Sequence, residues 1–186
     1  MNVKTPEDLF HHDLKDLYDA EHRIEEALQK MEKTAKNADL KKAFRQHRTE
    51  TQGQIKRLEQ VFEAFGKTPQ RKQCEAITGI IEEGEEMMEE VETPDVRDSA
   101  LIAAAQKVEH YEIASYRTIC RAAELLGLKD AAKLLTETLK EESATDDKLT
   151  ALAEKLEPQL VKVDFSKILR IYERAPDDGR VFILQG

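Results

Sequence analysis

Four long segments of the chain carry apolar residues at alternating spacings of three and four positions. This period matches one face of an α-helix, so each segment is predicted to be a helix that packs in a bundle. The first begins at Pro6 and continues past Met31, the second follows the turn at 37–39 and ends at Gly66, the third runs from about Val96 to Leu126, and the fourth runs from about Asp130 to Pro158.

The helix ends carry recognisable capping residues. Thr5 is a good N-cap, Pro6 suits the first helical position, and the acidic residues that follow favour the positive end of the helix dipole. Gly66 and Gly127 come directly after the second and third segments, where a glycine commonly ends a helix. These signals support the helical prediction independently of the apolar pattern.

Residues 67–97 connect the second helix to the third and contain a short acidic helical pattern, CEAITGIIEEGEEMMEEV. A connection of about 30 residues is too long for a tight hairpin and suits a crossover along the bundle. The predicted fold class is therefore all-α: a four-helix bundle of residues 1–157 with a long crossover that carries a short extra helix. In the C-terminal tail, residues 158–186, SKILRIYERA has a helical pattern and RVFIL a strand pattern, and the sequence does not decide how the tail packs.

Each of the four inward-facing stripes is apolar at both ends and polar near its middle. Because the midpoints of similar-length helices share one level in an up-down bundle, the polar residues are expected to converge on one layer. The residues expected there are Glu21, His47, Glu50, Glu109, Glu112, Glu142 and Asp146.

Six carboxylates in one bundle core cannot all be unpaired anions, because removing one charge from water costs several kcal/mol and like charges repel. Either several are protonated, or some lean out to solvent, or cations fill the layer. The number of acids favours cations over a polar layer of hydrogen-bonded acids that only fixes register. A ligand set rich in oxygen favours hard or borderline ions such as iron or manganese, with zinc as an alternative, whereas calcium usually recruits loop carbonyls.

Composition excludes several other classes of function. Charged residues make up 36% of the 186 positions and the net charge is −9, which disfavours nucleic acid as a partner. No run of about 18 apolar residues predicts a membrane span, and the N-terminus lacks the apolar run of a signal peptide. Cys74 and Cys120 lie far apart without a pairing motif, so we expect buried, reduced thiols in a cytoplasmic protein.

Four residues near the polar positions have open interpretations. Tyr18 and Tyr116 lie within one helical turn of the predicted ligands Glu21 and Glu112, and each could hydrogen-bond a ligand carboxylate. Gly53 in the second helix either leaves space beside the layer or allows close helix packing. His110 lies one position off the stripe and is expected outside the ligand set.

Three segments carry a resemblance to a known family. VRDSALIAAAQKVEHYEIASY, AFRQHRTETQGQI and LLTETLKEESATDDKLT resemble the bacterial YciE/YciF-type stress proteins of the ferritin-like superfamily, and the resemblance covers about residues 3–157. It implies a ferritin-like four-helix bundle, a homodimer, a two-metal centre and a link to stress responses.

The di-iron pattern of that superfamily has one Glu on each of two helices and Glu-x-x-His on each of the other two. By resemblance, Glu21 and either Glu109 or Glu112 match the single glutamates. Glu50 and Glu142 match the glutamates of the two motifs, yet Gly53 and Thr145 stand in the histidine positions. His47 precedes Glu50 in reversed order, and Asp146 offers another oxygen. These departures weaken a direct transfer of ferroxidase or peroxidase activity.

Two functions from different classes follow. The first is a redox or iron-handling protein whose metal pair reacts with oxygen or peroxide. The alternative is a non-catalytic dimeric stress protein with a structural or vestigial metal site. Metal storage is a third and weaker reading, because it requires a shell-forming oligomer.

Overall fold

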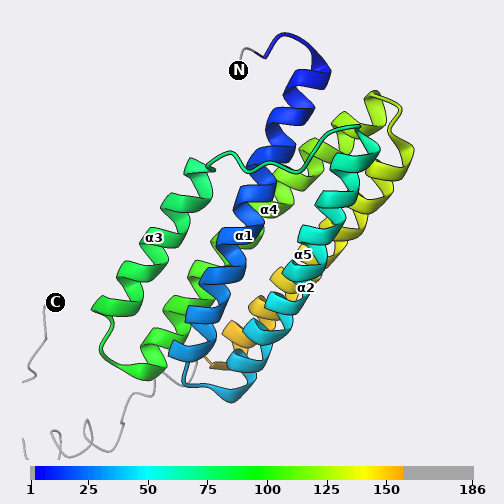
Figure 1. Cartoon of the computed structure of the whole chain (residues 1–186). Helices are drawn as coiled ribbons and strands as arrows, with labels where there is room; N and C mark the ends of the chain where they lie inside the picture. Colours follow the sequence, from blue (N-terminus) through cyan, green and yellow to red (C-terminus); the bar gives the residue numbers. More distant parts are fainter. Residues whose placement is uncertain (1–2, 157–186) are drawn as a thin grey trace, which may run out of the picture.

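The computed structural model describes residues 3–156, which form five helices and the turns between them (Figure 1). The helices are α1 (Pro6–Thr34), α2 (Ala38–Ala64), α3 (Glu75–Glu90), α4 (Pro94–Leu125) and α5 (Lys129–Leu156). None of the described helices combines the length and apolarity needed to cross a membrane. The predicted tail, 158–186, lies outside the described residues, so its boundary with the bundle stays a prediction.

The predicted capping residues begin and end the helices. Thr5 and Asp8 form a reciprocal capping box at the start of α1, with Pro6 in the first turn. The side chain of Asn37 accepts the backbone N–H groups of Asp39 and Leu40, so the predicted turn starts α2 directly. Gly66 and Gly127 follow α2 and α4 with φ of 70° and 72°, a left-handed conformation that glycine adopts without steric cost.

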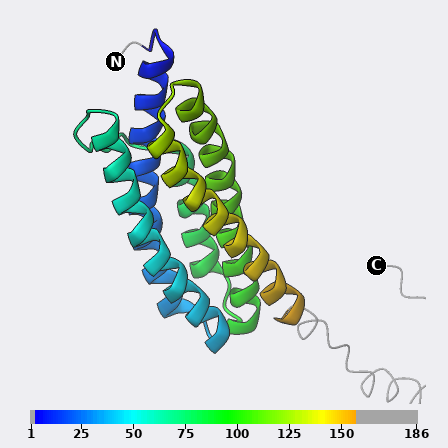
Figure 2. The same cartoon turned by 90° about the vertical axis from the view of Figure 1, so that its right-hand side faces the viewer.

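The four long helices form a closed ring around one core. The packed pairs are α1 with α2, α2 with α5, α5 with α4, and α4 with α1, so α2 and α4 lie diagonally across the bundle. The short helix α3 lies outside this ring against α4 and α1 (Figures 1 and 2). The all-α four-helix prediction, including the extra helix in the crossover, is confirmed.

Two apolar clusters fill the core and flank a polar layer. One cluster includes Ile24, Phe44 and Ile102, and the other includes Phe10, Leu58 and Ile119. The buried polar side chains between the ends of the stripes are Glu21, His47, Thr51, Gln54, Glu109, Glu112, Thr138, Glu142 and Thr145. The predicted arrangement of apolar ends and a polar middle is therefore present.

The inward face of α5 differs from the prediction at Asp146, which is expected in the polar layer but is half-buried, while the preceding residue Thr145 is buried. About two turns earlier the same offset recurs, because Thr138 is buried and Leu139 is half-buried. A hydrogen bond explains the burial of Thr138, because Nη1 of Arg57 donates to its hydroxyl over 2.9 Å. By hydrophobicity alone, Leu139 would be buried in preference to Thr138. The position of the neighbouring helix instead determines which side of α5 faces the core.

Two buried aspartates fix the connections outside the long helices. Asp98 accepts the backbone N–H groups of Lys36 and Asn37, each over 2.7 Å, and so ties the α1–α2 turn to α4. Asp19 accepts the N–H of Cys74 over 3.0 Å and the side chains of two arginines, which ties the start of α3 to α1. The pKa of Asp19 is lowered by these hydrogen bonds, although burial acts first and in the opposite direction. The sequence reasoning did not identify either aspartate.

Candidate metal centre

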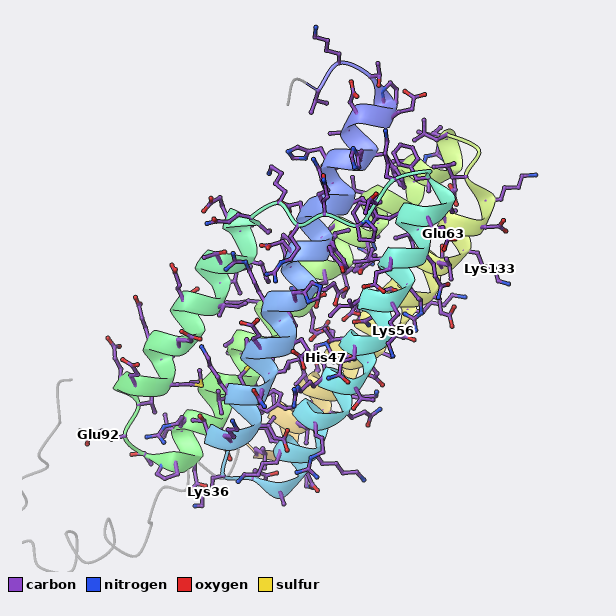
Figure 3. All side chains as sticks on the ribbon, viewed as in Figure 1. Lys36, His47, Lys56, Glu63, Glu92 and Lys133 are labelled. Carbon is purple, nitrogen blue, oxygen red and sulfur yellow. The ribbon has the colours of Figure 1, made fainter. Side chains whose placement is uncertain are left out.

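Four of the seven predicted ligands meet in the middle of the bundle. His47, Glu109, Glu112 and Glu142 each offer one ligand atom, and these atoms all lie within 4.8 Å of one another. All four side chains are buried. Figure 3 labels His47 on α2, where it begins the run of buried polar residues that interrupts the apolar stripe of that helix.

Helical spacing explains how these side chains converge. Glu109 and Glu112 lie three positions apart on α4, so both project from the same face of that helix. Glu142 projects from α5, which packs against both α2 and α4. Three helices therefore supply the four groups, and the sequence predicted all four.

The imidazole of His47 stands between two glutamates. Its Nδ1 lies 3.2 Å from Oε1 of Glu109, and its Nε2 lies 3.6 Å from Oε2 of Glu142. The Nε2 atom is buried and has no hydrogen-bond partner among the described residues. An imidazole nitrogen in this position is available to a metal ion.

Glu21 brings the fourth long helix to the layer. It is fully buried, and Tyr116 of α4 donates a hydrogen bond from its hydroxyl to Oε1 of Glu21. The other oxygen, Oε2, has no partner among the described residues. Tyr116 therefore holds one predicted ligand, Glu21, by a hydrogen bond.

Most of the carboxylate oxygens in the layer accept no hydrogen bond. Both oxygens of Glu109 and of Glu112, together with Oε2 of Glu21 and of Glu142, are buried without a hydrogen-bond partner in the described part of the chain. Two of them, Oε1 of Glu109 and Oε2 of Glu142, lie within ion-pair distance of the His47 imidazole. A buried polar atom left unpaired costs about 1–3 kcal/mol, and more when it is charged. Six such atoms beside one imidazole fit one or more cations, because a cation would satisfy several of them together.

The pKa values of these acids move in the direction that burial demands. Burial raises the pKa of Glu21, Glu109 and Glu112 well above the ordinary glutamate value, and the negative charge of Glu142 raises each further. Without a cation, burial therefore favours the protonated forms of these three acids.

A hydrogen-bond network supports the layer from the α2–α5 side. Nε2 of Gln54 donates to Oε1 of Glu142 and, over 3.1 Å, to Oε2 of Glu141. Arg57 donates to the same Glu141 oxygen over 2.8 Å, and its positive charge lowers the pKa of Glu21 against the larger effect of burial. The sequence pattern places Gln54 on the inward face of the second helix, so its burial could be predicted. The same pattern does not place Arg57 on that face, so its contact with the layer could not be predicted.

Two predicted ligands lie at the edge of the layer. Glu50 is half-buried and accepts a hydrogen bond from Gln46 over 2.9 Å, outside the four-residue group. Asp146 has its Oδ2 atom 3.3 Å from Nε2 of the exposed His110, while its Oδ1 atom is buried without a partner in the described residues. Whether either residue binds a metal stays a prediction.

Tyr18, His110 and Gly53 all lie outside the candidate ligand set. Tyr18 points away from the layer and donates to Glu59 over 3.0 Å. His110 is exposed, as expected for a residue off the stripe. A Cβ atom at Gly53 would meet no neighbouring atom within 4 Å, so close helix packing does not require this glycine.

A four-helix bundle with a long crossover and a carboxylate–histidine layer at mid-height is the architecture of ferritin-like proteins. Residues 5–162 match the family described as a domain of unknown function, DUF892. The chain is 54% identical over 154 residues to protein YciF of Escherichia coli strain K12, which covers 82% of this chain and 93% of that protein. The chain therefore belongs to the DUF892 family, and the resemblance found in the sequence is confirmed.

Solved structures give the same result. The crystal structure of the E. coli stress protein YciF matches with a TM-score of 0.81 at 52% identity, over 84% of this chain and 99% of that chain. YcfI of Rhodopseudomonas palustris, for which a structural role has been suggested, matches with a TM-score of 0.79 at 46% identity, over 80% and 95%. A protein from Xanthomonas campestris matches with a TM-score of 0.65 at 20% identity, over 91% and 98%, and this likeness supports the fold alone.

Proposed function

We propose that this chain is a stress-associated protein that binds a pair of divalent metal ions, iron foremost, and handles oxygen or peroxide with them. The observation that carries the proposal is the set of six buried carboxylate oxygens that have no hydrogen-bond partner and lie in the same polar layer as His47. The 54% identity to YciF, a protein described as a stress protein, supports the physiological setting.

The residues that would hold the ions are His47, Glu21, Glu109, Glu112 and Glu142. Their donor set of carboxylate oxygens and one imidazole suits iron or manganese, and zinc remains an alternative. Bound iron would supply a change of oxidation state between Fe(II) and Fe(III).

The protein's own groups prepare the site for that chemistry. Tyr116 and Gln54 orient Glu21 and Glu142 by hydrogen bonds, so two of the carboxylates are held in place by the fold. The apolar clusters on both sides of the layer shield its two ends from solvent. A buried, oriented carboxylate set binds cations strongly, because solvent screens the charges only weakly there.

A second candidate is a non-catalytic role in which the layer is structural or vestigial. It is favoured by Gly53 and Thr145, which stand where the superfamily pattern has histidine. It also agrees with the structural role suggested for YcfI of R. palustris.

One experiment separates the two candidates. Metal-free protein is loaded with Fe(II) without oxygen, its metal content is measured, and Fe(III) absorbance is followed after oxygen or peroxide is added. The redox function predicts about two ions per chain and faster oxidation than in buffer, with both lost in Glu142→Gln and retained in the exposed control Glu137→Gln. A structural layer predicts no oxidation above the buffer rate in any of the three proteins.

We also propose that the chain forms a homodimer in the cytoplasm. Near the end of α3, Met87 is exposed and Val91 is half-buried, so these two residues offer apolar surface, whereas Met88 packs partly against the core. Two free buried cysteines suit a reducing compartment. Light scattering at micromolar concentration tests the mass, and a strictly monomeric protein would contradict the dimer.

A further inference from the structure

A pocket between α2 and α5 reaches the buried layer from the surface. Its lining includes Ala43, His47 and Glu50 of α2 and Thr145 and Lys148 of α5. His47 belongs to the four-residue group, so the pocket touches the candidate ligands directly. Three other pockets in the described part of the chain are lined by residues outside that group.

Exposure falls steadily along this pocket. The side chain of Lys148 is 49% exposed, that of Glu50 is 26% exposed and that of His47 is 4% exposed. The order defines an outer opening at Lys148 and Glu50 and an inner end at His47. His47 is the member of the four-residue group that lines this pocket, and its Nε2 atom has no hydrogen-bond partner among the described residues.

The opening carries two opposite charges. Nζ of Lys148 lies 3.7 Å from Oε1 of Glu50, and Nε2 of Gln46 holds the same oxygen over 2.9 Å. At 3.7 Å the ion pair is longer than a hydrogen bond, and both side chains are reached by solvent. A cation that approaches His47 through this opening is attracted by the carboxylate of Glu50 and repelled by the ammonium group of Lys148.

We propose that divalent cations reach the carboxylate layer through this pocket, and that Glu50 and Lys148 set the rate of their passage. This inference rests on the proposed metal binding and assigns Glu50 a place at the opening, where it attracts the ion before His47 and the inner glutamates bind it. Separation of the Glu50–Lys148 pair frees the carboxylate for the incoming ion.

The test measures uptake rates with Co²⁺ as the probe. Metal-free full-length protein is mixed with Co²⁺ in a stopped-flow instrument, and the visible absorption of the bound ion is followed. Lys148→Gln is expected to accelerate uptake and Glu50→Gln to slow it, each by about three- to tenfold at low salt. Both effects should shrink as the salt concentration rises.

Lys133→Gln is the matched control, because it removes the same charge from the same helix. Lys133 is exposed and lies 15 positions before Lys148, about 22 Å along α5 and toward its other end (Figure 3). It should leave the uptake rate within twofold of the wild type. Ala43→Phe adds a steric test, since a bulky ring in the lining should slow uptake while circular dichroism confirms the fold.

The outcomes separate this inference from the proposed function. If wild type binds no Co²⁺, the proposed function fails and the access route with it. If wild type binds Co²⁺ but Lys148→Gln, Glu50→Gln and Ala43→Phe all take it up at the wild-type rate, metal binding stands and the route is wrong. A loss of bound Co²⁺ at saturation in Glu50→Gln would make Glu50 a ligand and overturn its place at the opening.

Discussion

Nδ1 of His47 lies 3.2 Å from Oε1 of Glu109, although the two residues belong to helices that face each other diagonally across the bundle. The contact therefore crosses the bundle axis. Glu142 approaches the same imidazole from α5, so a positive charge at this point would interact with side chains from three helices. A cation here would join the helices at the level of the polar layer.

Glu109→Gln tests the ligand role directly. The change keeps the shape of the side chain but removes one charge, so metal affinity should fall at least about tenfold. Without metal, the variant should be as stable as wild type or more stable, because one repelling buried charge is absent. Thermal unfolding with and without chelator, together with elemental analysis, measures both effects.

The opposite pattern would indicate a structural polar layer. In that case Glu109→Gln would leave metal content unchanged and destabilise the fold by about 1–3 kcal/mol through unpaired hydrogen bonds. Glu137→Gln, an exposed change on α5, controls for the lost charge.

The stability of the metal-free protein should depend on pH through the buried acids. The pKa of Glu112 is raised in the folded state, so the folded chain binds a proton that the unfolded chain releases. Its contribution therefore becomes more favourable as pH falls through the raised pKa toward the ordinary glutamate pKa of about 4.3, by up to about 1.4 kcal/mol per pH unit for one proton.

Comparison with Glu112→Gln isolates this contribution. His11 and His22 have lowered pKa values, chiefly through burial, and they act in the opposite direction below about pH 6.5. Their contributions cancel in the difference between the two proteins. Urea unfolding with chelator should show the stability of wild type relative to Glu112→Gln improving toward pH 5, and a constant difference would refute the raised pKa.

Gly53→Ala should stabilise the protein by about 1 kcal/mol, because alanine restricts the unfolded chain and favours the helix. A Cβ atom at this position meets nothing within 4 Å. Gly84 is the matched control, since its added Cβ would lie 3.3 Å from Cβ of Ala104, so Gly84→Ala should gain less or lose stability. Melting temperatures of the two variants provide the comparison, and equal gains would contradict the difference in space.

Asp98→Ala should destabilise the fold by about 2–4 kcal/mol, because it leaves the N–H groups of Lys36 and Asn37 without their charged acceptor. Asp95 lies one turn earlier on α4 and forms an exposed ion pair with Lys36 at 2.9 Å. Asp95→Ala should therefore cost less than about 1 kcal/mol. Equilibrium unfolding in urea measures both, and similar losses would show that Asp98 has no special role in the turn.

The sequence by itself determined the helices and the existence of the polar layer. Spacings of three and four positions identify one face of each helix, and Thr5, Asn37, Gly66 and Gly127 mark ends that depend on local backbone geometry alone. These features involve residues within one or two turns of each other, so they can be read without knowledge of the neighbouring helices.

Only the tertiary structure decided which polar residues meet. Adjacent positions on a helix point about 100° apart, so a stripe tolerates either Thr145 or Asp146 inside until the neighbouring helices fix the rotation. The same holds for Glu50, which shares a helix with His47 but faces the pocket opening. The ties made by Asp98, and the pairing of Gln54 with Glu142, join residues more than 60 positions apart. Their partners depend on how the helices slide and rotate against one another, which is set by packing of the whole core and not by any local pattern.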